Sequence, residues 1–509
     1  MNAVSSRSVA AAAPGCMRLS RLLEGLAVPP RDLEIAGLTL DSRESRPGSL
    51  FLACRGRRTH GLLHAADAVG RGAVAVLWDP DEAPPTEPLP PQVVALAVPG
   101  LGARVGELAD RYYDAPSAAL RVAAVTGTNG KTTCAYLLAQ AAGAAGTRCA
   151  YLGTIGFGWP GALHDAGLTT PDAVAVHRRL AEARGAGAAA MSMEVSSHAL
   201  DQQRVAAVRF DTAVFTNLTR DHLDYHGTLE AYAEAKARLF ATPGLRHAVL
   251  NAADPFGLEL ARRVEGRAQV TLYSATASPQ GLADGDWIFA TELRATAAGL
   301  ALQVASNRGG GTLRSRLVGR FNADNLLAAL GVLLGWGVPF VRALALLGEC
   351  AAPPGRMETF GGGPQPLAIV DYAHSPDALA KALEAARAHT NGRLFCVFGC
   401  GGERDPGKRP QMGAIAEAAA DVVIVTDDNP RREDARAIVE QILAGLRDPG
   451  SAEVIQDRAT AIHHALATAE RGDVVLIAGK GHEDYQQVGA ERRPFSDRAV
   501  VLDALGDRA

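Results

Sequence analysis

The chain has 509 residues, of which 48% are hydrophobic and 21% charged, and its formal net charge at pH 7 is −4. This length exceeds what one hydrophobic core usually holds, so we expect two to four domains with an ordinary soluble composition. The near-neutral charge, with no basic surplus and no block of like charge, argues against nucleic-acid binding and against a charged tail.

The start of the chain and its cysteines indicate a cytoplasmic protein. No apolar run reaches the length of a membrane span, and we interpret the Ala- and Ser-rich residues 1–16 as a disordered extension rather than a signal peptide. The number of cysteines is odd and their spacing fits neither a disulfide framework nor a zinc site, so reduced thiols are expected. They are Cys16, Cys54, Cys134, Cys149, Cys350, Cys396 and Cys400. We expect a monomer that binds neither nucleic acid nor membrane.

Residues 17–115 have the pattern of a small α/β domain. Polar clusters follow its expected strands, and the ends of strands are where open α/β sheets usually bind ligands. The expected strands are 38–40, 49–53 and 73–77, and the expected helices are 18–26 and 63–71.

Residues 116–352 form a second expected domain, which begins with a phosphate-binding loop. The apolar run 122–125 predicts a buried strand, and an apolar-periodic helix is expected from about Thr132 to Ala145. Between them lie the residues Gly127, Thr128, Asn129, Gly130, Lys131, Thr132 and Thr133. Backbone N–H groups here would surround a phosphate, while Lys131 adds a positive charge and the Thr132 hydroxyl a Mg²⁺ ligand. The alternative is an ordinary Gly-rich turn, since the first glycine of the general phosphate-loop pattern is replaced by Val125.

Two expected strands of this domain, 188–194 and 212–215, end in polar residues. In a parallel sheet these ends share an edge with the phosphate loop, which makes Glu194 and His222 plausible Mg²⁺ ligands. A helix cap or an ion pair is the alternative for Glu194. Residues 284–311 could be a β-hairpin, and 326–334 predict an apolar helix.

Residues 353–509 form a third expected domain that begins after the Pro/Gly break at 351–355. Its alternating strands and helices are typical of a doubly wound sheet. The expected strands are 367–370, 394–398, 422–425 and 474–478.

The stretches Gly-Thr-Asn-Gly-Lys-Thr-Thr, Met-Glu-Val-Ser-Ser-His, Thr-Arg-Asp-His-Leu-Asp-Tyr-His and Gly-Lys-Gly-His-Glu occur in this order along the chain. Together they resemble the Mur ligase family, the ATP-dependent amide ligases that build the peptide stem of peptidoglycan. The resemblance extends from about residue 17 to 505, and the shortened phosphate loop fits this family's own pattern. It implies three α/β domains: an N-terminal UDP-binding domain, a central P-loop ATPase domain with a parallel sheet, and a C-terminal Rossmann-like domain for the incoming amino acid.

The resemblance also assigns binding residues. Contacts to the UDP-N-acetylmuramoyl dipeptide are implied at Leu40, Ser42, Thr169, Thr170, Ser196, Gln202 and Arg204, and more loosely at Arg57–Thr59. ATP contacts beyond the phosphate loop are implied at Asn325, Arg356, Asp371 and His374.

Lys236 gains a role only through the resemblance, because the pattern alone indicates a solvated helix lysine. It matches a lysine that is carbamylated in this family, and this change turns a cation into a carboxylate that can help to hold a second Mg²⁺. Lys131, Glu194, His222 and Lys236 are the expected catalytic residues, and Thr132, Glu194, His222 and Lys236 are the expected metal ligands.

The stretch Asp428-Asn429-Pro430-Arg431 resembles that of members using meso-diaminopimelate. This amino acid carries an additional carboxylate at its far end, and a guanidinium grips a carboxylate with two parallel hydrogen bonds. The diaminopimelate contacts that the resemblance implies are Arg404, Asp428, Asn429, Pro430, Arg431, Gly479 and Glu483. Surface charge is the alternative for Arg431.

The resemblance implies that ATP phosphorylates the γ-carboxylate of the D-glutamyl residue, after which the amine of diaminopimelate displaces phosphate. Two other functions remain open from the sequence. A folylpolyglutamate synthetase shares fold and chemistry but would not be expected to carry the 428–431 stretch or a full first domain. A non-catalytic binding protein would be favoured by loss of Lys131, Glu194 or Lys236, and all three are present.

Overall fold

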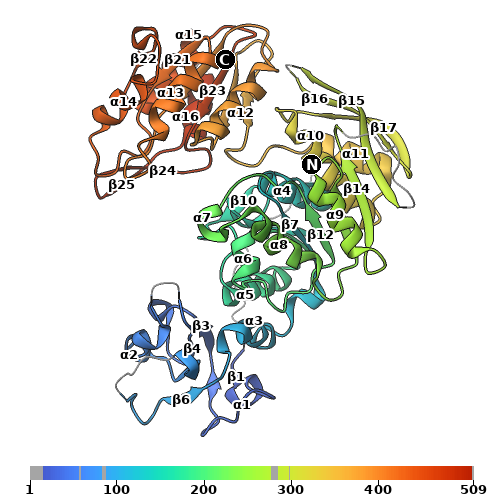
Figure 1. Cartoon of the computed structure of the whole chain (residues 1–509), viewed down its shortest axis with the longest axis vertical. Helices are drawn as coiled ribbons and strands as arrows, with labels where there is room; N and C mark the ends of the chain where they lie inside the picture. Colours follow the sequence, from blue (N-terminus) through green and yellow to red (C-terminus); the bar gives the residue numbers. More distant parts are fainter. Residues whose placement is uncertain (1–14, 57–58, 83–87, 277–284, 297, 507–509) are drawn as a thin grey trace. The chain divides into compact units, whose positions relative to one another are not determined.

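The structure is a computed structural model that describes residues 15–56, 59–82, 88–276, 285–296 and 298–506. The expected N-terminal extension is therefore outside the described residues up to position 14. The chain forms two compact units, and Figure 1 shows the course of the chain from blue to red along the sequence. The first unit comprises Met1–Lys131, Gly146–Leu250 and Phe256–Val270, and the second comprises Thr132–Ala145, Asn251–Pro255 and Thr271–Ala509.

The first unit contains a four-stranded parallel sheet in the order β3-β4-β5-β6. Its strands are β3 (Gly37–Thr39), β4 (Ser49–Ala53), β5 (Ala75–Trp78) and β6 (Val94–Ala97). β4 is buried along its whole length, which explains its uninterrupted apolar sequence. A separate pair, β1 (Met17–Arg18) and β2 (Glu34–Ile35), is antiparallel.

A second set of strands in the first unit surrounds the phosphate loop. β8, β11, β7, β12 and β13 are neighbours in that order and run parallel, and β9 and β10 continue the sheet antiparallel. Because the strands are parallel, the residues that follow β7, β11 and β12 reach the same sheet edge. The bounds are β7 (Arg121–Thr126), β8 (Cys149–Gly153), β9 (Gly156–Trp159), β10 (Ala162–His164), β11 (Ala190–Glu194), β12 (Thr212–Phe215) and β13 (His247–Asn251).

Helices connect these strands. The N-caps of α5, α6 and α8 are Asp172, Ser196 and Thr228, whose side chains accept a hydrogen bond from a backbone N–H of the first helical turn. The helices are α1 (Leu19–Leu22), α2 (Ala65–Gly70), α3 (Leu101–Tyr112), α5 (Ala173–Gly185), α6 (Ser197–Asp201), α7 (Leu223–His226), α8 (Leu229–Phe240) and α9 (Pro255–Val264).

The second unit includes an antiparallel run of long strands and three helices. β14 (Gln269–Ser274) pairs in parallel with β15 (Asp286–Thr296), which is followed by the antiparallel strands β16 (Gly299–Ser306) and β17 (Gly309–Ser315). Three strands thus replace the expected hairpin, because pairing continues beyond residue 311. The helices are α4 (Lys131–Ala144), α10 (Phe321–Gly335) and α11 (Phe340–Gly348).

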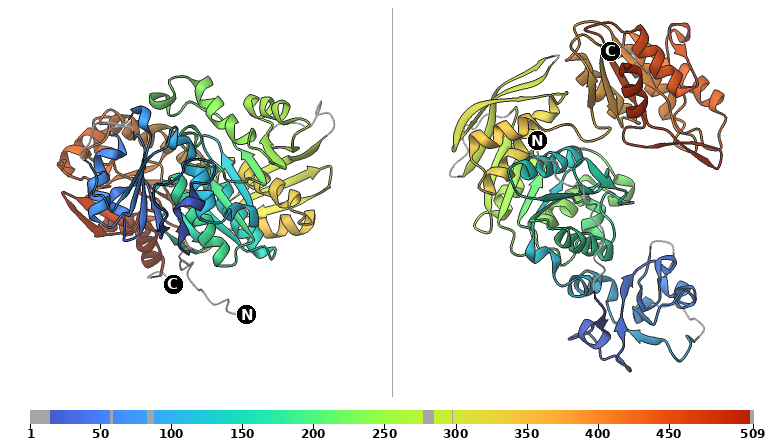
Figure 2. Two further views of the ribbon diagram at one scale, coloured as in Figure 1. Left: turned by 90° about the horizontal axis from the view of Figure 1, so that it is seen from below. Right: turned by 180° about the vertical axis from the view of Figure 1, so that it is seen from behind.

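The second unit also contains a six-stranded sheet in the order β18-β19-β23-β20-β21-β22. Only β18 is antiparallel. One apolar core lies under α12, α13 and α14, and another under α15 and α16 on the opposite face. The right-hand view of Figure 2 shows the orange and red helices of this region beside its strands. The bounds are β18 (Glu358–Gly361), β19 (Leu367–Asp371), β20 (Leu394–Phe398), β21 (Val422–Val425), β22 (Glu453–Val454), β23 (Val474–Ala478), α12 (Pro376–Arg387), α13 (Lys408–Ala419), α14 (Ala435–Leu443), α15 (Arg458–Thr468) and α16 (Asp497–Gly506). A hairpin of β24 (Tyr485–Val488) and β25 (Glu491–Pro494) follows β23.

Most of the helices and strands expected from the sequence agree with the observed bounds to within a few residues. The predicted fold class, α/β with parallel sheets, is confirmed. The helix expected over 18–26 is shorter, since α1 ends at Leu22. None of the seven cysteines forms a disulfide, as the sequence predicts. In the part of the chain that the structure describes, no helix combines the length and the apolar character needed to cross a membrane.

Candidate active site

The phosphate loop joins β7 to α4, as the sequence predicts. Gly127 has φ +145°, and a Cβ added there would collide with the hydroxyl of Thr216, so only glycine fits. The Thr216 hydroxyl donates to the carbonyl oxygen of Asn129 at 2.6 Å, and the side-chain oxygen of Asn217 accepts from the Asn129 N–H at 2.9 Å. The end of β12 therefore holds the loop in shape.

Two lysines meet at this loop. Lys131 Nζ donates to the carbonyl oxygens of Gly127 and Thr128 at 2.9 and 2.8 Å, and Lys236 Nζ donates to the same Gly127 oxygen at 2.9 Å. Lys236 is 1% exposed, and its ammonium lies 4.2 Å from the centre of the Tyr232 ring. Burial, with the charge of Lys131 as the next cause, holds the pKa of Lys236 well below its usual range.

Glu194 ends β11 and is fully buried. Its carboxylate accepts hydrogen bonds from the Tyr151 hydroxyl at 2.5 Å and from the N–H and hydroxyl of Thr154 at 2.8 and 3.1 Å. The Thr154 hydroxyl also lies 3.0 Å from that of Thr169. These bonds fix the orientation of the carboxylate at the end of β11.

His222 lies beside the loop but on the surface. It has φ +53° and precedes α7, and its ring contacts His198 edge-on at 4.9 Å between centroids. Its ring is also 6.1 Å from that of Tyr232, whose hydroxyl lies 3.2 Å from the hydroxyl of Thr128. The structure thus brings His222, Lys236 and the loop together around Tyr232.

A preformed metal cage is not seen. Within the described ranges, no three His, Cys, Asp or Glu side chains are arranged so that they could hold a metal ion. Mg²⁺ in phosphate-binding sites commonly binds through one or two protein ligands together with waters and phosphate oxygens. Thr132, in the first turn of α4, and Glu194, at the end of β11, each carry oxygen atoms of the kind that Mg²⁺ prefers.

The residues expected to hold the muramoyl dipeptide gather at the end of β11. The Thr170 hydroxyl accepts from the Ser196 N–H at 3.2 Å, and Arg204 Nη1 donates to the Thr170 carbonyl at 2.9 Å. Arg204 also binds the side-chain oxygen of Gln202 at 3.0 and 2.6 Å. With Thr169 they form one polar group at the edge that β11 shares with the phosphate loop.

Leu40 and Ser42 lie elsewhere in the first unit, where β3 ends. Leu40 directly follows β3, and Ser42 is in a short 3-10 turn. The Ser42 hydroxyl is the largest cause that holds the pKa of Asp67 below its usual value. The looser prediction at Arg57–Thr59 lies outside the described residues except for Thr59.

In the second unit, Asn325 is buried in α10. Its amide Nδ2 donates to the side-chain oxygen of Asn322 at 2.8 Å, and its own oxygen accepts from the Cys134 thiol at 3.2 Å. These contacts fix the rotamer of the side chain expected on the adenine side.

Arg356, Asp371 and His374 lie together at the end of β19. The Asp371 carboxylate accepts from two backbone N–H groups, one of them that of Met357 at 2.8 Å, and burial raises its pKa. The Arg356 guanidinium lies 4.8 Å from the centre of the Tyr372 ring, which also contacts the His374 ring at 4.6 Å. The buried Nε of Arg356 has no hydrogen-bond partner among the described atoms.

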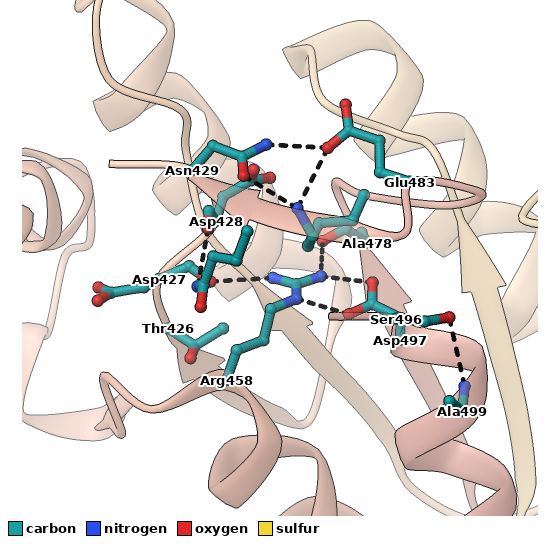
Figure 3. A network of polar contacts seen from close by, with 12 residues as sticks. Thr426, Asp427, Asp428, Asn429, Arg458, Ala478, Glu483, Ser496, Asp497 and Ala499 are labelled. Atoms are coloured by element: carbon teal, nitrogen blue, oxygen red, sulfur yellow. Dashed lines mark hydrogen bonds and ion pairs between the residues drawn. The ribbon is translucent and has the colours of Figure 1, made fainter. Parts of the chain in front are cut away.

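The stretch 428–431 follows β21 and faces the residues that follow β23 (Figure 3). Asn429 Nδ2 donates to Glu483 Oε2 at 2.9 Å, and Lys480 Nζ contacts both Asn429 Oδ1 and Glu483 Oε2 at 3.1 Å. Gly479 has φ +120°, and a Cβ there would lie 2.6 Å from an oxygen of Asp428, so the two strand ends approach closely.

Two guanidinium groups lie next to this cluster. Arg431, at φ +51°, donates through Nη1 to the carbonyl of Gly402 at 2.6 Å. A Cβ on Gly401 would lie 3.0 Å from Arg431 Nη1 and 3.8 Å from Arg404 Cγ, which places both arginines at one loop. Arg404 is exposed and Arg431 is half-buried. The structure therefore brings together all the residues expected to bind diaminopimelate.

The sequence analysis missed several residues of these groups. Arg458 and Asp497 form a fully buried ion pair at 2.7 Å, and Arg458 also donates to the carbonyl of Ala478 at 3.0 Å (Figure 3). The sequence analysis quoted Lys480 within the motif Gly-Lys-Gly-His-Glu but gave it no role. The one signal for a role in binding was its position directly after an apolar strand.

The chain matches known families along most of its length. Residues 34–113 match the catalytic domain of the Mur ligase family, residues 125–333 match the Mur ligase middle domain, and residues 355–481 match the Mur ligase glutamate ligase domain.

Curated relatives are similar over nearly the whole chain. A UDP-N-acetylmuramoyl-L-alanyl-D-glutamate–2,6-diaminopimelate ligase of Pseudomonas aeruginosa is 52% identical over 468 residues, which cover 92% of this chain and 94% of the relative. A ligase of the same name from Xanthomonas campestris pv. campestris is 50% identical and covers 96% and 97%.

A solved structure of a UDP-N-acetylmuramoyl-L-alanyl-D-glutamate–2,6-diaminopimelate ligase is 35% identical, with a TM-score of 0.70 over 97% of this chain and 99% of that one. The predicted three-domain α/β architecture is thereby confirmed. The chain belongs to the Mur ligase family of ATP-dependent ligases.

Proposed function

We propose that this ligase uses ATP to join meso-2,6-diaminopimelate to UDP-N-acetylmuramoyl-L-alanyl-D-glutamate in the synthesis of peptidoglycan precursors. The observation that carries the choice of amino acid is the group at the ends of β21 and β23. Two arginines, Arg404 and Arg431, lie at the loop of Gly401, and the amide of Asn429, two residues before Arg431, donates to the carboxylate of Glu483. The far end of diaminopimelate carries a carboxylate and an ammonium, and this pair of charges complements that arrangement. The names of the curated relatives support the same substrates.

The reaction proceeds in two steps. The γ-carboxylate of the D-glutamyl residue attacks the γ-phosphorus of ATP, which gives an acyl phosphate and releases ADP. The amine of diaminopimelate then attacks the acyl carbon and expels phosphate, which leaves the new amide. Lys131 neutralises the negative charge that collects when a carboxylate approaches a polyanion. Thr170, Ser196, Gln202 and Arg204 hold the muramoyl dipeptide.

Mg²⁺ would supply further neutralisation of phosphate charge. Thr132, Glu194, His222 and a modified Lys236 would hold it. The side-chain oxygens of Thr132 and Glu194 suit a hard cation such as Mg²⁺. A carbamate on Lys236 would add a negatively charged oxygen ligand, which an amine cannot provide.

The surroundings of Lys236 support its carbamylation. An amine reacts with carbon dioxide only when it is unprotonated, and burial disfavours the ammonium of Lys236. Carbamylation would remove the hydrogen bond from the Lys236 ammonium to the Gly127 carbonyl and would add two carboxylate oxygens at the same place. We therefore propose N6-carboxylysine at this position.

The sequence predictions on domains complete the proposal. Residues 17–115 would bind the UDP end, 116–352 ATP, and 353–509 the amino acid, in a cytoplasmic monomer. A folylpolyglutamate synthetase is the alternative activity. It is disfavoured by the family match over residues 34–113 and by the presence of Arg404 and Arg431 at the loop of Gly401.

One assay tests the function. The enzyme is given ATP, Mg²⁺ and the UDP-linked dipeptide, with diaminopimelate, lysine or glutamate in parallel, and phosphate release and ligated product are measured. We expect product only with diaminopimelate, and phosphate release only when dipeptide and amino acid are both present. Product from glutamate and a folate acceptor, with none from the UDP-linked dipeptide, would support the alternative.

A further inference from the structure

Lys480 is a buried cation that none of the assignments above uses. It follows β23 directly, and its side chain is fully buried. Its ammonium contacts Glu483 Oε2 and Asn429 Oδ1, each at 3.1 Å, and lies 5.4 Å from the centre of the Tyr485 ring. A buried charge is tolerated only when it is paired and hydrogen-bonded, so these contacts fix the ammonium in place.

The two oxygens of Glu483 are in unequal surroundings. Oε2 accepts both from Lys480 and from Asn429 Nδ2, the latter at 2.9 Å. Figure 3 shows the other oxygen, Oε1, pointing away from these two partners. The Glu483 side chain is 19% exposed, so a ligand can approach it.

Asn429 also holds the Glu483 carboxylate, but through a neutral donor. The Asn429 amide is kept in its orientation because its Oδ1 accepts from the Gln487 N–H at 2.9 Å and from Lys480. A hydrogen bond from an ammonium to a carboxylate is roughly twice as strong as one between neutral groups. Lys480 therefore supplies the dominant restraint on the rotamer of Glu483.

We infer that Lys480 is a positioning residue for the choice of amino acid: its ammonium holds Oε2 of Glu483 and so presents Oε1 to the far ammonium group of diaminopimelate. This inference rests on the proposed function. Lys480 acts through Glu483 and touches no substrate itself.

The stereochemistry of the far carbon gives this role a specific readout. The meso and LL isomers of diaminopimelate differ in the arrangement of carboxylate and ammonium at that carbon. To distinguish them, the enzyme must hold the anion that binds the ammonium at a fixed distance from the guanidiniums that bind the carboxylate. If Lys480 no longer holds Glu483, the enzyme should bind meso-diaminopimelate more weakly and should also discriminate less between the meso and LL isomers.

The test compares Lys480→Met with wild type, using meso- and LL-diaminopimelate as the probes. Loss of one charge-assisted contact predicts a rise of about tenfold in KM for the meso isomer. The ratio of kcat/KM for meso over LL should fall by a similar factor, while KM for ATP and for the UDP-linked dipeptide stays the same. Lys381→Met, which removes an exposed lysine paired with Asp377 on α12, is the matched control and should change none of these values.

A double-mutant cycle separates positioning from a general structural effect. If Lys480 acts through Glu483, Lys480→Met should add little once Glu483→Gln is present, because residues that act as a unit are non-additive. Should Lys480→Met fail to fold, as a melting curve would reveal, the cycle is run with Lys480→Gln, which keeps a donor without the charge. Additive effects in the cycle overturn the inference.

The outcomes separate this inference from the proposed function. Wild-type enzyme that ligates no diaminopimelate overturns the function and the role of Lys480 with it. An active wild type whose meso-over-LL ratio is unchanged by Lys480→Met overturns only the role of Lys480.

Discussion

Lys131 and Lys236 donate to the same carbonyl oxygen, that of Gly127, yet their surroundings differ. Lys131 is half-buried at the start of α4, whereas Lys236 is fully buried in α8. Lys131 is therefore placed where its side chain can face phosphate, whereas the burial of Lys236 disfavours the charged form of its side chain. The sequence motif predicted the first role, but burial of Lys236 could not be read from a helix rich in Ala and polar residues.

Lys131→Ala should abolish ligation with little loss of stability. Lys131 donates to the loop carbonyls of Gly127 and Thr128 and is only half-buried, so we expect its removal to leave the core intact. Removing one preorganised group that faces developing charge typically costs about 10²–10³ in kcat. Steady-state kinetics measure the loss of ligation, and a melting curve measures any loss of stability. Lys381→Ala, which removes an exposed lysine, is the control. An active Lys131→Ala enzyme would remove this lysine from the mechanism.

Lys236→Ala should be nearly inactive and partly rescued by a small added carboxylic acid. The acid can enter the space that the side chain leaves and replace the carbamate oxygens. Activity is measured against acid concentration, with wild type treated in the same way to exclude a general effect of the acid. An intact mass showing unmodified lysine in a fully active enzyme would contradict the modification.

Arg431→Ala should lower kcat/KM for diaminopimelate by roughly 2–4 kcal/mol, the cost of breaking a charged pair. Lysine lacks the far carboxylate, so its kcat/KM should change much less and the preference for diaminopimelate should shrink. Because Arg431 also donates to the Gly402 carbonyl, Arg431→Lys serves as a control that keeps the charge. An unchanged ratio of the two kcat/KM values would show that Arg431 is not the selector.

Among the secondary-structure elements, those with an unbroken apolar sequence were the most predictable. β12, β20, β21 and β23 have the predicted bounds, because buried parallel strands show continuous apolar runs. Helix α8 begins directly after its N-cap Thr228, whose hydroxyl accepts from the Ala231 N–H at 3.1 Å. The ends of α1 could not be predicted, since local propensity does not contain the tertiary contacts that end a short helix.

The buried ion pair between Arg458 and Asp497 could not be predicted from the sequence. Its partners are 39 positions apart, at the start of α15 and of α16, and each alone resembles a helix-start residue exposed to solvent. Only the packing of both helices on one face of the six-stranded sheet brings them together. There Arg458 also contacts the carbonyls of Asp427 and Ala478, which precede the candidate amino-acid site.

Arg458→Met should destabilise the protein by about 3–5 kcal/mol, because it leaves Asp497 buried and unpaired. The double variant Arg458→Met/Asp497→Leu should recover much of this loss, since no lone charge remains. Chemical denaturation of the three proteins measures both values. Equal stability of single and double variants would contradict an uncompensated charge as the cause.

At the scale of the whole molecule, the order of motifs predicted the family and the three-domain architecture, and the curated relatives confirm both. Contacts between distant segments were not predictable. His389 illustrates this, since it accepts from the Gly319 N–H at 3.0 Å and its Nδ1 contacts the Thr296 carbonyl at 2.5 Å. These partners lie 70 and 93 positions away and carry no recognisable signal in the sequence.

His389 should make the stability of the molecule depend on pH. Its two bonds require a neutral ring with the proton on Nδ1, and burial lowers its pKa below the ordinary 6.5. As the pH falls through 6.5 toward this lowered pKa, the unfolded chain takes up the proton first, so the stabilisation present at higher pH is lost. His389→Gln can donate and accept but does not titrate, and the other histidines are common to both proteins. Denaturation midpoints measured from about pH 8 to 5, across the ordinary histidine range, should therefore fall more steeply for wild type than for the variant. Parallel pH profiles would show that His389 does not carry this dependence.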